Sequence, residues 1–256
     1  MLYRGLLIHE HVNGARMLGS RVRHAAALLA AGVLLSGCTS YGWDNQAEDD
    51  LLGYQETPDP FEPVNRAVFQ FNRGVDTVLL KPAAQGYDHV PEEYRGVIAN
   101  FLQHISLPVV LLNDIFQGEW DRAGDAGVRL IANSVVLGLG DLVPERHPYH
   151  EEDFGQTLGA HGSGPGFYLV LPVLGPSTAR DATGRIVDWA LSPTTHIDGT
   201  TTFSISTGGL DGVRRRHRAL GRLEQLEADS VDFYARMRSL YTQRRDMRIE
   251  NRGQDR

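Results

Sequence analysis

The stretch FGQTLGAHGSGPGFYLVLPVLGPSTA, residues 154–179, contains six glycines and three prolines but no Asp, Glu, Lys or Arg. A helix that spans a membrane needs about 20 predominantly apolar residues, and this density of glycine and proline disfavours a continuous helix. Irregular uncharged backbone is tolerated at membrane depth only where protein or a water-filled cavity covers it. Two interpretations stay open: the segment lines a lipid-accessible cavity beside the bilayer, or it is a loop buried under helices.

Helical periodicity dominates the sequence before this segment. Asp59 is the expected N-cap of a first helix, with Glu62 completing a capping box and Lys81-Pro82 ending the helix. Apolar residues recur there at spacings of three and four: Phe61, Val64, Val68, Phe71, Val75 and Val78. Such a stripe more often faces a protein core than lipid.

Further helices are predicted on both sides of the charge-free segment. A second begins at Pro91 and is expected to end before Pro108, and a third begins at about Glu119. The last is predicted over about residues 219–249, and Thr201–Ser206 is the one candidate strand. The sequence therefore predicts a mainly α fold with little or no β structure.

The N-terminus has the features of a bacterial lipoprotein precursor. Arg21, Arg23 and His24 precede the apolar run 25–35, and Leu35-Ser36-Gly37-Cys38 resembles a lipobox. We expect residues 1–37 to be a signal peptide, with translation starting at Met17, and Cys38 to carry the lipid. Residues 38–58 are polar and predict a flexible tether. Thr39 after the cysteine favours the outer membrane.

The balance of basic and acidic residues differs between two parts of the chain after the predicted signal peptide. Residues 38–211 hold 9 basic and 24 acidic side chains, whereas residues 212–256 hold 12 basic and 7 acidic ones. The acidic body excludes nucleic acid as a partner. The predicted domain covers residues 59–250, followed by a disordered tail over 251–256. The predicted last helix has a basic flank, which consists of Arg236, Arg244, Arg245 and Arg248. This flank is predicted to contact a partner or an anionic surface, or to be simply a solvated helix face.

Signatures of catalysis are missing. Gly162–Gly166 lacks the Gly-Lys-Ser/Thr of a phosphate loop, and no Gly-x-Ser-x-Gly elbow occurs. Ser177, Asp181 and His196 are the residue types of a catalytic triad, but any chain of this length contains such a set, so they do not predict one. His147 and His150 flank Pro148 and do not predict a metal site. We expect no enzyme activity, cofactor or metal.

Motifs distributed in order over about residues 57–250 resemble the MlaA (VacJ) family of outer-membrane lipoproteins. The matching motifs are Asp59-Pro60-Phe61-Glu62, Asn65-Arg66, Phe69, Phe71-Asn72, Lys81-Pro82, Val90-Pro91, Asn100-Phe101, Asn113, Gln117-Gly118, Phe154-Gly155-Gln156-Thr157-Leu158-Gly159, Gly162, Gly164, Tyr168-Leu169-Val170-Leu171-Pro172, Gly175-Pro176-Ser177-Thr178 and Arg180-Asp181. His161 and Phe167 depart from the family pattern, in which an aromatic residue and a proline are usual.

The resemblance implies a ring- or disc-like arrangement of amphipathic helices around a central amphipathic channel in the inner leaflet of the outer membrane. It implies removal of phospholipid mislocalised to the outer leaflet, which maintains lipid asymmetry. It also implies two partners: a trimeric porin and the periplasmic lipid carrier MlaC. The alternative function is a structural lipoprotein that braces a porin or envelope assembly without handling lipid. A lipid hydrolase is the third and least supported.

We place the lipid path along residues 130–142 and 154–176. The candidate residues are Leu130, Asn133, Ser134, Leu137, Asp141, Ser163, Tyr168, Leu169 and Leu171. The polar members are expected to meet the head group, and the apolar members the acyl chains.

Overall fold

Helices make up most of the part of the chain that the structure describes, residues 57–195 and 201–251 of a computed structural model. In chain order, the elements are α2 (Glu62–Val75), the π-helix η2 (Asp76–Leu80), α3 (Lys81–Asp88), α4 (Glu92–Gln117), α5 (Trp120–Ser134), α6 (Phe154–Ala160), β1 (Tyr168–Leu171), β2 (Gly175–Thr178), α7 (Ala179–Leu191), the short 3₁₀ helix η3 (Pro193–Thr195), α8 (Thr201–Arg218), α9 (Arg222–Ala228) and α10 (Phe233–Ile249). The predicted mainly α fold is confirmed. The predicted signal peptide, Cys38, the predicted tether up to residue 56 and residues 252–256 lie outside the described residues.

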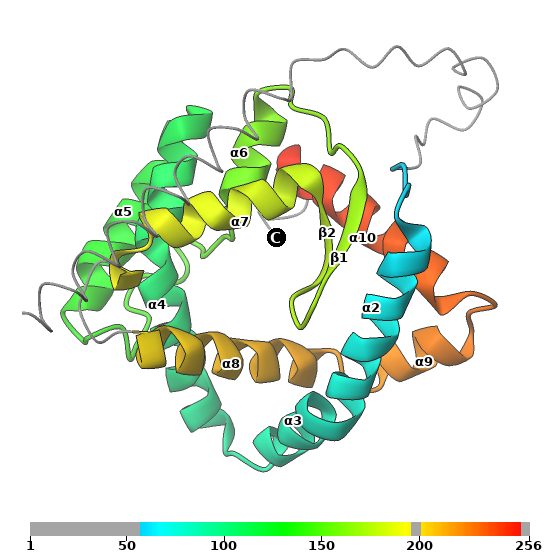
Figure 1. The fold of residues 1–256 in the computed structure, drawn as a ribbon. Helices are drawn as coiled ribbons and strands as arrows, with labels where there is room; N and C mark the ends of the chain where they lie inside the picture. The colour runs from blue at the N-terminus through cyan, green and yellow to red at the C-terminus, as the bar shows by residue number, and fades with distance from the viewer. Residues whose placement is uncertain (1–56, 196–200, 252–256) are drawn as a thin grey trace, which may run out of the picture. The chain divides into compact units, whose positions relative to one another are not determined.

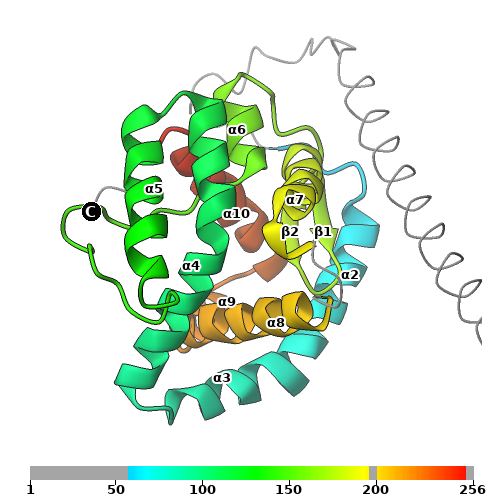
Figure 2. The same ribbon diagram turned by 90° about the vertical axis from the view of Figure 1, so that its left-hand side faces the viewer.

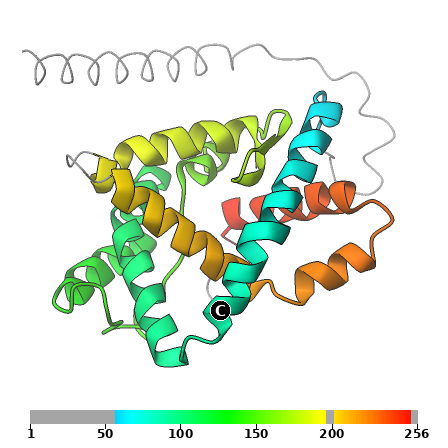
Figure 3. The same cartoon turned by 60° about the horizontal axis from the view of Figure 1, so that its bottom comes forward.

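The helices of this unit follow one another around a central region instead of stacking in layers (Figure 1). α4 and α5 lie side by side (Figure 2), and α3 packs against α8. α7 and α8 meet through η3, as Figure 3 shows from another side. This agrees with the ring-like arrangement predicted above, whereas a channel through the centre stays a prediction.

Two prolines lie inside helical segments that were predicted to end at them. α2 continues through η2 into α3, and the Lys81 N–H bonds to the carbonyl of Asp76 five residues back. This wider turn lies immediately before Pro82, whose missing N–H and bulky ring disfavour regular α geometry. α4 likewise runs through Pro108 to Gln117. The predicted ends at both prolines are therefore wrong.

Because α4 continues through Pro108, it is longer than the helix predicted to end before that proline. Among the described helices it alone is long and apolar enough to cross a membrane, with a mean hydropathy of 1.4, and only 22% of that apolar window is buried. Core helices of soluble proteins can meet the same length and composition test. The finding therefore does not by itself place α4 in a bilayer.

Three further local predictions are wrong. α2 begins at Glu62 without a side-chain cap, and the Asp59 carboxylate accepts instead from the Asn65 amide at 2.7 Å and from the Tyr234 hydroxyl. Residues 201–206 belong to α8, because packing of Phe203 on Phe101 outweighs the β preference of the sequence. The predicted last helix is interrupted before α10, whose N-cap is Asp232.

The charge-free segment forms α6, a loop and a β-hairpin. β1 and β2 are antiparallel, with Tyr168 opposite Thr178, and the turn between them places Val173 at a φ of +66°. Tyr168 and Val170 pack with Phe69 of α2 and Tyr234 of α10 in one apolar cluster. The expectation that no continuous helix forms here is confirmed.

Candidate functional site

The hairpin is fixed to α2 by two asparagine side chains. The Asn65 amide donates to the Tyr168 carbonyl at 3.1 Å, and its oxygen accepts from the Val170 N–H at 2.9 Å. Seven residues along the same helix face, Asn72 bonds in the same way to the Leu171 carbonyl at 2.9 Å and the Val173 N–H at 2.7 Å. The two amides therefore satisfy an edge of β1 that has no neighbouring strand.

A buried arginine joins α10 to the starts of α6 and α7. Both terminal nitrogens of Arg245 bond to Asp153 at 2.6 and 2.8 Å, and one also bonds to Asp181 at 2.8 Å. Burial alone would raise the pKa of both carboxyls, but the Arg245 guanidinium outweighs it and holds both below the ordinary value. Arg245 is 7% exposed. The prediction that it contacts a partner or an anionic surface is therefore wrong, because its charge is used inside the unit.

Two glycines allow α6 and α7 to approach each other beside this ion-pair cluster. A Cβ on Gly184 would lie 2.3 Å from the backbone nitrogen of Gly155. A Cβ on Gly155 would lie 2.8 Å from both Arg245 and Asp181. Any larger residue at these positions would push the helices apart.

Two other carboxyls lie nearby, those of buried Glu152 and half-buried Asp188. The Asp188 carboxylate accepts from the Phe154 N–H at 3.0 Å and from the Asn113 amide at 2.9 Å. Burial raises the pKa of Asp188 to about 6, and it raises that of Glu152, which accepts from Gln117, also to about 6. These polar contacts hold α4, α6 and α7 together.

The predicted lipid-path residues do not form one cluster. Figure 1 shows α5 and the hairpin on opposite sides of the central region. Asp141 pairs with Arg129 at 2.6 Å and bonds to Asn133, which is buried, and Tyr168 is fully buried. These three are therefore engaged in packing.

The remaining lipid-path candidates are more accessible. Ser134, Leu137 and Ser163 are exposed, whereas Leu130, Leu169 and Leu171 are half-buried. Leu137, which is 74% exposed, also has a φ of +55°. Nothing in the described contacts prevents these six from meeting a ligand, and their role in a lipid path stays a prediction.

Apolar side chains cover much of the outside of the unit. Among the described residues, 26 large hydrophobic side chains are exposed, 11 hydrophobic residues are buried and 18 buried residues are polar or charged. Exposed hydrophobic residues on α5 and the segment after it are Trp120, Val128, Ile131, Val135, Leu137, Leu139 and Leu142. Water-soluble proteins bury most residues of these types. The surface therefore fits contact with an apolar phase.

The apolar stripe of α2 belongs to this outer surface. Val64, Phe71 and Val78 are 61, 57 and 80% exposed. The opposite face, with Asn65 and Phe69, is the buried one. The interpretation of this stripe as core is therefore wrong for these three residues, whereas half-buried Val68 does pack against the Phe69 cluster.

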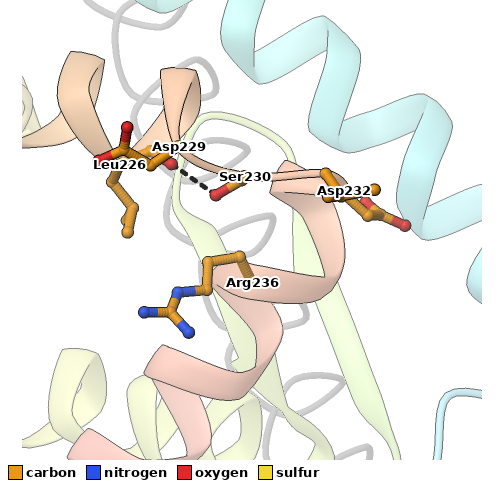
Figure 4. A pocket seen from close by; sticks show the side chains of 6 residues that line it. Leu226, Asp229, Ser230, Asp232 and Arg236 are labelled. Atoms are coloured by element: carbon orange, nitrogen blue, oxygen red, sulfur yellow. Dashed lines mark hydrogen bonds between the residues drawn. The ribbon is translucent and has the colours of Figure 1, made fainter.

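The arginines of the basic flank of α10 differ in exposure and in ion pairing. Arg236 makes no ion pair in the described residues and lines a surface cavity of about 430 Å³ with Leu226 and Asp229 (Figure 4). Arg244 is exposed, whereas Arg248 bonds to Glu151 at 2.8 Å. Arg236 and Arg244 are therefore the members of the flank that are accessible to a partner.

The catalytic trio that the sequence analysis rejected is not assembled in the described residues. Ser177 is fully buried, Asp181 is held by Arg245, and His196 lies outside the described part of the chain. Within residues 57–195 and 201–251, no group of three His, Cys, Asp or Glu side chains is placed to hold a metal ion.

The sequence prediction missed the hairpin anchors. Asn65 and Asn72 are seven residues apart, which places them on one helix face, and each lies beside an apolar residue of the helix, Val64 and Phe71. That spacing was available as a signal. The exposure of the α2 stripe had no such signal, since periodicity does not distinguish a core from a lipid.

Comparison with known proteins adds an independent observation. The family model described as MlaA lipoprotein matches residues 57–248. Two proteins named intermembrane phospholipid transport system lipoprotein MlaA are similar to this chain. The one from Shigella flexneri is 32% identical over 240 residues, which is 90% of this chain and 89% of that protein. The one from Escherichia coli K12 is 31% identical over 238 residues, with the same two shares.

A solved structure is also similar. It comes from work on the structural basis for maintenance of bacterial outer membrane lipid asymmetry, and it matches this chain with a TM-score of 0.66 at 30% sequence identity. The match covers 75% of this chain and 98% of that one. Sequence and fold thus point to the same relatives.

Proposed function

This chain belongs to the MlaA lipoprotein family, and we propose that it acts in intermembrane phospholipid transport that maintains the lipid asymmetry of the outer membrane. In this function it takes mislocalised phospholipids from the outer leaflet and passes them to a periplasmic lipid carrier. It does so without covalent chemistry.

The observation that carries the proposal is the distribution of polarity. The unit exposes more large apolar side chains than it buries, and its interior is rich in ion pairs and amides. A protein with an apolar exterior and a polar interior suits a site among acyl chains that offers a polar path to head groups.

The energetic need for such a path is large. Exposing an acyl chain to water costs about 0.8 kcal/mol for each CH₂ group, so a free phospholipid leaves a bilayer very slowly. An amphipathic channel, with one wall for the head group and one for the tails, removes most of this cost. The exposed and half-buried candidates Leu137, Ser163 and Leu169 are the residues we assign to it.

The location follows from the same proposal. Acylated Cys38 anchors the chain in the periplasm-facing leaflet of the outer membrane, and the exposed apolar surface embeds part of the unit there. A trimeric porin is the proposed neighbour in the membrane. Exposed Arg236 and Arg244 are the proposed contacts for an anionic surface or for the carrier MlaC.

The test measures surface-exposed phospholipid in a deletion strain complemented with the wild-type protein or with Cys38→Ala. We expect phospholipid to accumulate on the surface of the deletion strain and only the acylated protein to correct it. Unchanged surface lipid, in a strain without a second pathway, would contradict transport and favour the lipoprotein that braces a porin.

A further inference from the structure

A cavity lined by α2, η2, the start of α3, the hairpin, α8, α9 and α10 combines charge with apolar surface. Its volume is about 220 Å³. It is smaller than the pockets of about 300–1,000 Å³ that enclose drug-sized ligands. Its size therefore suits a head group and not a whole diacyl lipid.

The charged part of the lining is balanced. It consists of three cations and three carboxylates: Arg73, Lys81, Arg216, Asp76, Glu224 and Glu227. A purely anionic ligand would face three carboxylates with no cation of its own. A ligand with one phosphate and one ammonium group matches both signs.

The ion pairs across this lining can be exchanged for contacts with a ligand. Lys81 and Glu224 are 3.3 Å apart, and their side chains are 37 and 33% exposed. Arg73 and Glu227 also pair, and both are about 40% exposed. Pairs this exposed contribute little to folding, so a phosphate and an ammonium group can replace the partners at small cost.

Arg216 supplies a second, independent observation. It is 8% exposed, and its Nε and Nη2 donate to Asp76 and Glu224 at 2.7 and 2.6 Å. Its Nη1 is buried and has no hydrogen-bond partner in the described residues. Buried donors without acceptors are rare in folded proteins. Nη1 has almost no exposed surface, so a ligand's acceptor oxygen would reach it once the partly exposed partner Glu224 moves aside.

The rest of the cavity fits the start of acyl chains. Its apolar lining consists of Phe69, Leu80, Val173, Leu223, Phe233 and Met237. Val173 lies in the hairpin turn and is 62% exposed, as is its neighbour Leu174 at 60%. Tails that leave the cavity would therefore meet further apolar surface.

We propose that this cavity binds the head group of a zwitterionic phospholipid with a primary ammonium group, the phosphate on Lys81 and Arg216 and the ammonium on Glu227 and Asp76. The assignment rests on the proposed transport function and adds the preferred substrate class to it.

Lys81 provides a specific probe, because it is the only lysine in the sequence. Reductive methylation of the purified full-length protein with ¹³C-formaldehyde places a dimethylamino label on its Nζ. The Lys81→Arg variant lacks the label and assigns its NMR signal. The label is then titrated with dihexanoyl-phosphatidylethanolamine, dihexanoyl-phosphatidylglycerol, glycerophosphoethanolamine and inorganic phosphate.

We expect saturable shifts, with the ethanolamine lipid binding about tenfold more tightly than the glycerol lipid. Glu227→Gln should reduce this preference to less than about twofold without changing the thermal unfolding midpoint, since that pair is exposed. Glu93→Gln, an exposed acid on α4, is the matched control and should keep the preference.

Other outcomes separate the alternatives. Equal binding of both lipids, or binding of phosphate alone, would overturn the zwitterionic assignment. Equal affinity for glycerophosphoethanolamine and the lipid would show a site for a free head group. A label whose NMR signal does not shift with any of the four ligands would overturn the proposed site. If surface phospholipid is still corrected in cells, the transport function stands without it.

Discussion

Asn65 and Asn72 lie seven residues apart on α2, and each side chain both donates to and accepts from the backbone of the hairpin. Together they occupy the position that a neighbouring strand would have. The helix thereby fixes the register of a segment that carries no charged side chain, and the apolar face of α2 is left on the outside.

Replacing Asn65 should loosen the hairpin. Asn65→Ala leaves the Tyr168 carbonyl and the Val170 N–H without their partner, which should cost about 1–3 kcal/mol of unfolding free energy. Hydrogen exchange of the 168–173 amides should accelerate. Gln85→Ala, at an exposed site on α3, should change stability by less than about 0.5 kcal/mol. Equal exchange in both variants would contradict the anchoring role.

Gly184 should tolerate no side chain. Gly184→Ala places a Cβ 2.3 Å from the Gly155 nitrogen, and the forced separation of α6 and α7 should lower the unfolding free energy by about 1–3 kcal/mol. Gly74→Ala, in a helix with open space around it, should raise it by about 0.5–1 kcal/mol. Chemical denaturation of the two variants measures both values. A neutral Gly184→Ala would show that the helices can shift freely.

Adjacent arginines on α10 should behave differently. Arg245→Gln leaves Asp153 and Asp181 without their shared cation and should destabilise the protein by about 3–5 kcal/mol. Arg244→Gln should leave the unfolding midpoint unchanged, since Arg244 is exposed. Only the second variant therefore reports on partner binding, measured by pull-down of the carrier. Similar melting of both would refute the buried role of Arg245.

The contribution of Glu152 and Asp188 to stability should rise as the pH falls from about 7 to about 5. The pKa of Glu152 rises from 4.5, and that of Asp188 from 3.8, to about 6 in the fold. The folded protein therefore holds these protons more tightly than the unfolded chain, by about 1.4 kcal/mol for each pKa unit. The Arg245-paired carboxyls have lowered pKa values, so their contribution is lost only below about 3.8.

Thermal unfolding across this pH range checks the sign. The double variant Glu152→Gln, Asp188→Asn should lose most of the rise between pH 7 and pH 5, while Glu93→Gln should keep it. A wild-type midpoint that falls over this interval in parallel with the double variant would be inconsistent with protonation of these two groups.

Exposed apolar residues at the end of α5 and directly after it should decide membrane partition. Ile131 and Val135 are 76 and 79% exposed, so Ile131→Gln with Val135→Gln should leave folding intact and weaken flotation of the Cys38→Ala protein with liposomes. Each buried side chain of this size contributes about 1.5–3 kcal/mol to burial in an apolar phase. Glu145→Gln, at another exposed site, is the control. Undiminished flotation would assign the membrane contact to other helices.

Local patterns predicted the elements better than their ends. Spacings of three and four predicted most of the long helices, and the glycines and prolines of 154–179 predicted the break in helix. The helix ends predicted at Pro82 and Pro108 are wrong, because a π-helical turn precedes Pro82 and α4 continues through Pro108. The strand predicted at Thr201–Ser206 is wrong, because tertiary packing of α8 outweighs the local β preference of these residues.

The sequence by itself determined the helical class, the break in helix within residues 154–179 and the family, since these depend on local spacing and on motifs in order. Only the tertiary structure decided which faces are buried. Periodicity shows that α2 has an apolar face but not whether water, protein or lipid meets it. It likewise shows that Arg244 and Arg245 are basic, but the two acids that bury Arg245 are 64 and 92 residues away. Contacts over such distances exist only once the chain is folded.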